Sequence, residues 1–200
     1  MNIQELMNEL FLWCRDGGPH DYSKSCDTLK TGNPETELTK VAVSMFATPE
    51  IIREVSVWGA KFLIVHEPTF YDHYDRRIPD DPVTQAKADL LSASGLAIWR
   101  YHDHPHVKYK DMICEGQIRF FGLEGEWIKG PRPAVNRFRL KEAMTPRELA
   151  RQFRGKGNAQ NIRLCGAVDQ PCTNLSLCFG TPGGVFDELR NPDIDLVLTG

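Results

Sequence analysis

The chain of 200 residues has no excess of basic side chains. Its 24 lysines and arginines are outnumbered by 27 aspartates and glutamates, and the formal net charge is −3. Proteins that bind nucleic acid usually carry a basic excess, so the charge gives no reason to expect such a partner. An apolar run of about 18 residues, the length that a transmembrane helix needs, is also missing. We therefore expect neither nucleic acid nor a membrane as a partner.

Signals for export and for disulfide bonds are missing as well. Residues 1–13 contain Glu5 and Glu9 but no basic segment, so they differ from a secretory signal and we expect a cytoplasmic protein. The six cysteines are scattered, without a Cys-x-x-Cys pair. In a chain long enough to bury a substantial core, such cysteines are more typical of reduced, buried thiols than of disulfides or a cysteine-rich zinc site.

Two apolar segments that run into histidine and acid side chains are the strongest signal in the sequence. Phe62–Val65 is followed at once by His66-Glu67, and Gly95–Tyr101 is followed by residues 102–106, His-Asp-His-Pro-His. Continuous apolar runs of this length suit parallel strands that are covered on both faces. Ligands gather at the carboxyl ends of such strands, so we expect these side chains to meet at one edge of a sheet.

Helices are expected between these strands. The segments 48–59 and 81–95 each open with a capping side chain and a proline, carry an apolar stripe and end with a glycine. A strand is predicted at 41–46, so the first helix completes a βαβ unit with parallel pairing and a right-handed crossover. The same part of the chain is expected to hold a helix at 2–14, an irregular connection at 20–39 and a site-lining loop at 68–82.

The last third of the chain gives weaker signals. We expect an edge strand at 138–140 and a helix that opens at Thr145-Pro146, while 113–121 and 127–128 fit either a helix or a strand. Short apolar segments follow at 162–168, 175–179 and 196–198. The resulting fold class is α/β, with mixed, largely parallel sheets flanked by helices.

Two similar segments of the sequence predict an internal duplication. Phe46-Ala47-Thr48-Pro49 resembles Phe179-Gly180-Thr181-Pro182, and an apolar strand ends 20 residues after each phenylalanine, at His66 and at Thr199. We therefore expect a first half at 1–135, which carries the histidines, and the start of a second half at 136–200. The duplication also predicts that the strand 195–198 lies in the same sheet as 62–65.

The side chains at the two strand ends suit a metal site. His102 and His106 are spaced i, i+4, and with His66 and Glu67 they offer imidazole and carboxylate donors for zinc, iron, manganese or nickel, among which the donor set does not choose. Two such ions about 3.5–4 Å apart would activate water for hydrolysis. The alternative is a set of hydrogen-bonded structural histidines.

Other polar residues have simpler interpretations. We expect His20, Asp21 and Asp27 to be solvated, and likewise Asp72, His73 and Asp75, although these last three could support metal ligands. Arg100 could bind a phosphate or carboxylate group or form a structural ion pair.

The stretch from Thr48-Pro49 through Trp58-Gly59-Ala60 to Val65-His66-Glu67-Pro68 resembles the signature of the dinuclear-metal-centre family, known as the NIF-three-like or GTP cyclohydrolase I type 2 proteins. The segments 99–106 and 195–200 resemble two later motifs of that family, so the resemblance covers most of the chain. It implies the NIF-three-like fold, two bound divalent metal ions and a homo-oligomer in the form of a ring-shaped hexamer. It also implies a metal-dependent hydrolase that acts on a small nucleotide-like or phosphorylated molecule.

The resemblance also implies the ligand positions. His66 matches the first metal histidine, and Glu67 stands where a second histidine is usual. His102 matches the histidine before the metal aspartate, and His106 stands where that aspartate is usual. The implied metal site is therefore His66, Glu67, His102 and His106, with no catalytic residue assigned. The last ligands of the family would lie beyond Gly200, so either the sequence is a fragment or its site is incomplete.

Two other functions remain open from the sequence alone. One is a metal-binding or protein-interaction module without turnover, and the other is an ordinary α/β domain with clustered structural histidines. Metal that survives dialysis would exclude the ordinary α/β domain. Metal-dependent product release would exclude the module without turnover. The substrate itself has no signature in the sequence.

Overall fold

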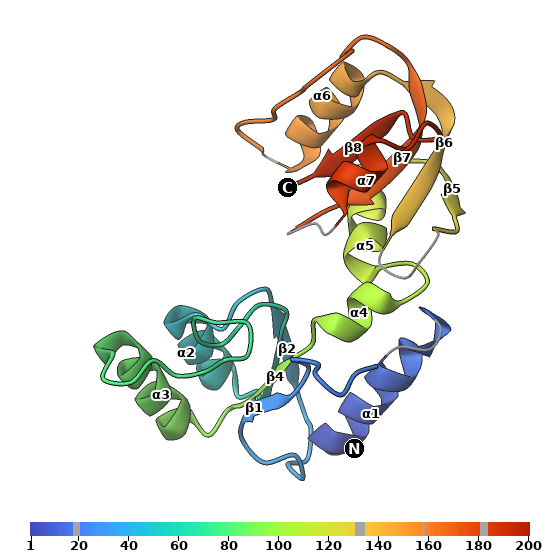
Figure 1. The fold of residues 1–200 in the computed structure, drawn as a ribbon. Helices are drawn as coiled ribbons and strands as arrows, with labels where there is room; N and C mark the ends of the chain where they lie inside the picture. Colours follow the sequence, from blue (N-terminus) through green and yellow to red (C-terminus); the bar gives the residue numbers. More distant parts are fainter. Residues whose placement is uncertain (18–20, 131–134, 158, 181–183) are drawn as a thin grey trace. The chain divides into compact units, whose positions relative to one another are not determined.

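A computed structural model describes residues 1–17, 21–130, 135–157, 159–180 and 184–200 (Figure 1). The predicted Gly18-Pro19 break, His20, Thr181 and Pro182 lie outside these residues. The chain divides into two compact units, Met1–Pro105 and His106–Gly200. This border lies earlier than the one expected at 135/136, because α5 (Met112–Phe121) contributes Cys114 and Ile118 to the core of the second unit.

The first unit contains a four-stranded mixed sheet in the order β1-β4-β3-β2. As predicted, β2 (Val41–Ser44), β3 (Phe62–Val65) and β4 (Ala97–Arg100) are parallel neighbours. The edge strand β1 (Leu29–Thr31) pairs antiparallel with β4 and lies in a segment that was expected to be irregular. Val65 is in register with Arg100, so β3 and β4 end at the same edge of the sheet.

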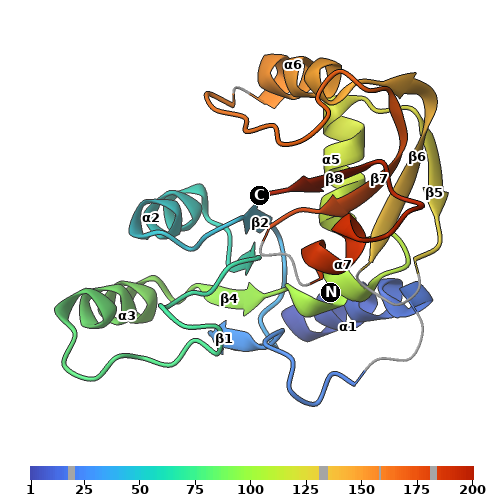
Figure 2. The same ribbon diagram turned by 45° about the horizontal axis from the view of Figure 1, so that its top comes forward.

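Helices cover both faces of this sheet. Leu63 and Ile98 on one face share a core with Ile52 of α2 (Pro49–Trp58) and Leu91 of α3 (Pro82–Ser94). These two helices lie side by side (Figures 1 and 2). Trp99 on the other face meets Phe11 of α1 (Ile3–Trp13) edge to face, with ring centroids 5.2 Å apart. A short 3₁₀ helix, Arg15–Gly17, follows α1.

The predicted helix ends are confirmed. Thr48 caps α2 by accepting a hydrogen bond from the backbone N–H of Ile51, and Asp81 caps α3 by accepting one from Thr84. Gly59 and Gly95 close these helices with φ angles of 82° and 60°, a region that favours glycine. The local capping chemistry therefore sets where both helices begin and end.

The second unit contains a mixed sheet in the order β5-β6-β7-β8. The antiparallel part joins β5 (Gly125–Ile128), β6 (Asn136–Met144) and β7 (Cys172–Cys178). The prediction of an edge strand at 138–140 is wrong, because β6 pairs with β5 on one side and with β7 on the other. The helix α6 (Pro146–Gly157) begins as predicted, and 162–168 forms no strand.

Both units contain strand–helix–strand segments with parallel strands. In the first they are β2-α2-β3 and β3-α3-β4, and in the second α7 (Val185–Leu189) connects β7 to β8 (Leu196–Thr199). The expectation that the last strand joins the sheet of β3 is wrong, because β8 pairs with β7 from Leu175↔Leu196 to Cys178↔Thr199. The duplication itself stays a prediction. The α/β class with mixed sheets and flanking helices is confirmed.

Two further expectations concern disulfide bonds and transmembrane helices. All six cysteines are free, and Cys165 is the exposed one among them. Among the described residues, none of the helices has the length and apolar character needed to span a membrane.

Candidate metal centre

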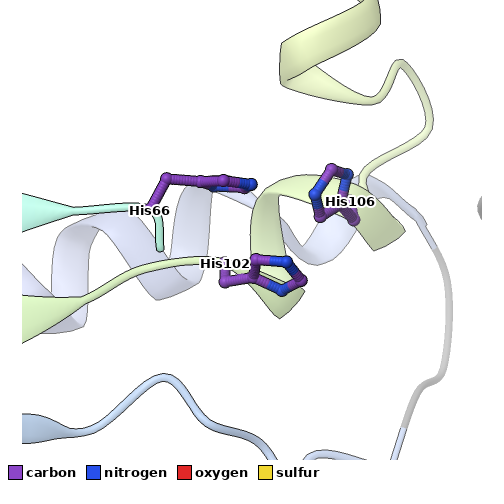
Figure 3. A group of neighbouring side chains, drawn as sticks. All are labelled: His66, His102 and His106. Atoms are coloured by element: carbon purple, nitrogen blue, oxygen red, sulfur yellow. The ribbon is translucent and has the colours of Figure 1, made fainter. Parts of the chain in front are cut away.

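Three of the four predicted ligands come together where β3 and β4 end. His66 directly follows β3, His102 directly precedes the short helix α4 (Asp103–Val107), and His106 lies on that helix. Each ring offers a nitrogen, and these nitrogens all lie within 4.8 Å of one another (Figure 3). The border between the two compact units falls inside α4, so His106 is carried by a helix that begins in the first unit.

The start of α4 is held by Asp27, a residue that we expected to be solvated. That expectation is wrong, because Asp27 is only 5% exposed. Its Oδ1 accepts hydrogen bonds from the backbone N–H groups of His102 (2.7 Å) and Asp103 (2.8 Å), and its Oδ2 accepts one from that of His104 (2.8 Å). Burial acts to raise the pKa of Asp27, but the hydrogen bonds from the His104 ring and from these N–H groups lower it overall. An ionised carboxylate therefore sits at the positive end of the helix.

His104 has a structural role. Its Nδ1 lies 2.6 Å from Asp27 Oδ2, and its ring stacks on Tyr22 with centroids 3.7 Å apart. Phe11 of α1 covers it as well, with a centroid separation of 4.2 Å. The ring is therefore held among aromatic side chains and fixes α4 to the first unit.

The orientation of His102 is set by its neighbour Asp103. Oδ1 of Asp103 lies 2.9 Å from Nδ1 of His102, and Oδ2 accepts hydrogen bonds from the Ser25 hydroxyl and the Cys26 N–H. The hydrogen bond with His102 holds the pKa of Asp103 well below its usual range, although burial acts in the opposite direction. An ionised carboxylate only accepts hydrogen bonds, so Nδ1 of His102 is the donor in this hydrogen bond.

His106 is oriented in the same way by Asp111, which the sequence analysis missed. Its Nδ1 lies 2.6 Å from Asp111 Oδ2. The other oxygen of Asp111 caps α5 by accepting hydrogen bonds from the N–H groups of Ile113 (2.8 Å) and Cys114 (3.1 Å). An acid directly before a helix is a capping signal, but the sequence leaves both helix and strand open at 113–121, so Asp111 cannot be identified as a cap from the sequence alone. A carboxylate on Nδ1 is the usual support for a histidine that ligates metal through Nε2.

Glu67, the fourth predicted ligand, lies outside the three-histidine group. It is half-buried, and its backbone N–H donates to the carbonyl of Met45. A second group with metal-ligand spacing, formed by Cys26, His102 and Asp103, shares His102 with the first. Burial, together with the charge of Asp103, raises the pKa of the Cys26 thiol to about 12, which disfavours the thiolate that a metal needs.

The loop after His66 is held by buried charged groups. The Arg100 side chain is 1% exposed and donates to the backbone carbonyls of His66 and His73, so it supports the loop rather than offering its guanidinium to a ligand. Asp75, which we expected to be solvated, forms an ion pair of 3.0 Å with Lys30, and its side chain is only 4% exposed. These contacts fix the backbone on which His66 sits.

A family model described as Duf34/NIF3 (NGG1p interacting factor 3) matches residues 1–200. Two proteins named "GTP cyclohydrolase 1 type 2 homolog" are similar to the chain. The one from Clostridium perfringens (strain 13) is 19% identical and the alignment covers 97% of this chain and 76% of that protein. The one from Lactococcus lactis (strain IL1403) is 22% identical, with coverages of 100% and 77%.

Among solved structures, Staphylococcus aureus protein SA1388 superposes with a TM-score of 0.78. It is 16% identical in sequence, and the match covers 100% of this chain and 79% of that one. At this identity the likeness establishes the fold.

Proposed function

The chain belongs to the Duf34/NIF3 family, and on this premise we propose that it is a metal-dependent hydrolase of a small nucleotide-like or phosphorylated molecule. In this proposal His66, His102 and His106 bind a divalent ion, and Glu67 is a further donor for a second one. The observation that carries it is the convergence of the three rings, whose ligand nitrogens lie within 4.8 Å of one another, with a carboxylate beside Nδ1 of both His102 and His106. Zinc, iron, manganese and nickel all suit these donors.

The three imidazoles fit such an ion. Zinc–nitrogen bonds of about 2.0–2.1 Å in a tetrahedral site place the ligand nitrogens about 3.4 Å apart. The nitrogens here lie within 4.8 Å of one another, and all three side chains are half-buried, so small rotations of the rings are enough to close the site. The donors are imidazoles at the end of a sheet, where ligands of α/β proteins gather.

The chain's own residues would prepare the site for this chemistry. A bound divalent ion would supply Lewis acidity for the attack of water on the substrate. Asp103 and Asp111 hold the proton of each ring on Nδ1, and Asp27 holds the start of the helix that carries Asp103 and His106. The Arg100 side chain fixes the backbone of His66 by donating a hydrogen bond to its carbonyl.

The direct test is the metal content of variants. His66→Ala and His106→Ala each remove one donor, and we expect the molar ratio of metal to protein after dialysis to fall sharply in both. Glu142→Ala is the control, because this exposed acid of β6 lies outside the groups with metal-ligand spacing, and its ratio should match the wild type. Unchanged ratios in both of the first two variants would refute the proposed site.

Turnover is tested separately with a panel of nucleotides and phosphomonoesters. Product release that needs added metal and is lost in His66→Ala would support the hydrolase. Full metal loading without any turnover would favour the non-catalytic metal-binding module instead. The family resemblance also leads us to propose a homo-oligomer, up to a hexamer, which light scattering measures directly.

A further inference from the structure

An apolar cavity of about 500 Å³ lies in the first unit, between the start of α2, the start of α3 and residues 68–71. This volume is within the usual range for small-molecule sites. Its walls are mainly apolar, and Phe46, Phe70 and Tyr71 are among the side chains that line it. Phe46 and Tyr71 are more than half exposed, so the cavity opens to solvent. None of the three histidines of the candidate metal centre lines it, so the two sites are distinct.

A primary amine is part of this apolar wall. Lys87, on α3, lines the cavity and is half-buried. Its Nζ lies 5.9 Å from the centroid of the Phe70 ring and donates a hydrogen bond to the backbone carbonyl of Thr69. Phe70 and Thr69 both line the cavity, so these contacts hold the amine at its wall. In the neutral amine, the hydrogen bond to Thr69 uses an N–H group and leaves the nitrogen lone pair available for reaction.

The surroundings of Lys87 weaken its charged form. Burial lowers the pKa of Lys87 and outweighs the charge of Asp75, which acts to raise it. Asp75 is itself paired with Lys30 at 3.0 Å, in a contact whose side chains are 9% and 4% exposed, so much of its charge is already balanced. Arg53, another cation of the lining, lies 3.8 Å from Glu50. The lining therefore suits an uncharged molecule, and a lysine desolvated in an apolar pocket is a typical nucleophile for carbonyl groups.

We propose that the ε-amine of Lys87 forms an imine with an apolar aldehyde that enters this cavity. The nitrogen lone pair attacks the carbonyl carbon, a C–N bond forms, and a proton passes from nitrogen to oxygen through solvent to give a carbinolamine. The C–O bond then breaks and water leaves, so the reaction needs no oxidant, reductant or metal. The N–H of the protonated imine donates to the Thr69 carbonyl, and the apolar body lies against Phe46 and Phe70. The site is independent of the proposed hydrolase.

The test is reductive trapping on the full chain, read at each lysine. The chain is incubated near neutral pH with 2-naphthaldehyde and sodium cyanoborohydride, which reduces a protonated imine to a stable amine, and the labelled peptides are quantified by mass spectrometry. We expect Lys87 to be labelled about 10-fold or more above each other lysine, because the cavity removes the naphthyl group from water. The other lysines are controls within the same sample. EDTA should leave the preference unchanged, which separates it from the metal centre.

Two comparisons separate a cavity site from a merely reactive amine. Formaldehyde has no apolar body, so its preference for Lys87 should be much smaller, and in urea the preference for naphthaldehyde should disappear. The variant Ala86→Trp places an indole in the lining of the cavity at an exposed helix position, so it should keep the fold and lose most of the preference. Gln85→Trp is the matched control, because Gln85 is exposed on the same helix and is not among the described residues that line the cavity.

Four results would overturn the proposal. They are equal labelling of Lys87 and the other lysines, an equal preference with formaldehyde, a preference that persists in urea, and loss of the preference with EDTA. A full preference in a folded Ala86→Trp variant would also overturn it. The comparison among lysines needs only the wild-type chain, so it decides the matter if that variant does not fold.

Discussion

At the scale of single residues, three histidines of the segment 102–106 make the same hydrogen bond and differ in what surrounds them. His102, His104 and His106 each place Nδ1 within 2.9 Å of a carboxylate oxygen. The His104 side chain is 11% exposed and lies among aromatic rings, whereas those of His102 and His106 are 24% and 26% exposed. A carboxylate on Nδ1 therefore fixes a ring in every case, and access to the other nitrogen separates a structural histidine from a ligand.

The carboxylate of Asp103 should matter for metal affinity as well as for orientation. Asp103→Asn replaces an anionic acceptor with a neutral amide and lowers the basicity of His102. We expect metal to bind about 10- to 100-fold more weakly, the usual effect of removing such a support. Competition with a chromophoric chelator measures the affinity. Asp21→Asn, at an exposed position, is the control. An affinity within error of the wild type would mean that His102 does not ligate.

Cys26 should be dispensable for metal binding. Its thiol pKa is raised to about 12, mainly by burial, so a thiolate is disfavoured at neutral pH. We expect Cys26→Ser to keep the wild-type metal content, and the cobalt-substituted wild type to show no sulfur-to-cobalt charge-transfer band. A band that disappears in Cys26→Ser would instead place the ion in the group formed by Cys26, His102 and Asp103.

At the scale of elements, α4 depends on a residue far away in the sequence. A helix of five residues gains little from its own hydrogen bonds, because nucleation costs nearly as much as they return. The N–H groups at its start have no partner within the helix, and Asp27 accepts hydrogen bonds from three of them. The position of His106 therefore depends on a carboxylate from the segment before β1.

Asp27→Asn should destabilise the protein in a pH-dependent way. The folded-state pKa of Asp27 lies below its ordinary value of 3.8, so its contribution is fully present above about pH 4 and is lost as the pH falls further. We expect the variant to lose about 1–3 kcal/mol of unfolding free energy at pH 7, since a buried ionic acceptor is removed. The difference from the wild type should shrink below pH 4.

Urea unfolding followed by circular dichroism at pH 7 and at pH 3 measures both effects, with Asp21→Asn as the control. A difference that stays constant or grows toward low pH would show that Asp27 is not ionised in the folded chain.

Elements whose signals are local were predictable, and those that depend on distant partners were not. The caps at Thr48 and Asp81 and the parallel pair β3–β4 follow from neighbouring residues, and all are confirmed. The strand β1 has only three residues and forms because it pairs with β4. Its sequence is too short to show the alternating hydrophobicity that would predict a strand. In the same way, the sheet to which β8 belongs is decided by β7 rather than by its own residues.

The candidate site follows the same rule. The histidines could be found because they follow apolar strands, and the parallel pairing brings them to one edge. Asp27 could not be assigned, because it lies 75 residues before His102 in the chain and carries no pattern of its own. The structure shows that Asp103 orients the ring of His102 and that Asp111 orients the ring of His106. Neither role can be assigned from the sequence alone.

At the scale of the whole molecule, each compact unit has its own hydrophobic core. The first core contains Leu63 and Ile98, and the second contains Leu175 and Phe138. The members of each core come from one unit alone. Units with separate cores are the usual basis of separate cooperative unfolding.

Truncating one core should therefore loosen mainly its own unit. Leu63 and Leu175 are both fully buried, and replacing either with alanine should cost about 2–5 kcal/mol, because apolar contacts are lost and a cavity is left. We expect Leu175→Ala to accelerate amide hydrogen exchange mainly in peptides from His106–Gly200, and Leu63→Ala to do so mainly in peptides from Met1–Pro105. The two variants are matched in chemistry and burial, so each serves as the control for the other. Exchange measured by mass spectrometry that rises equally in both units for either variant would show that the chain opens as one cooperative body, and that the two cores do not unfold separately.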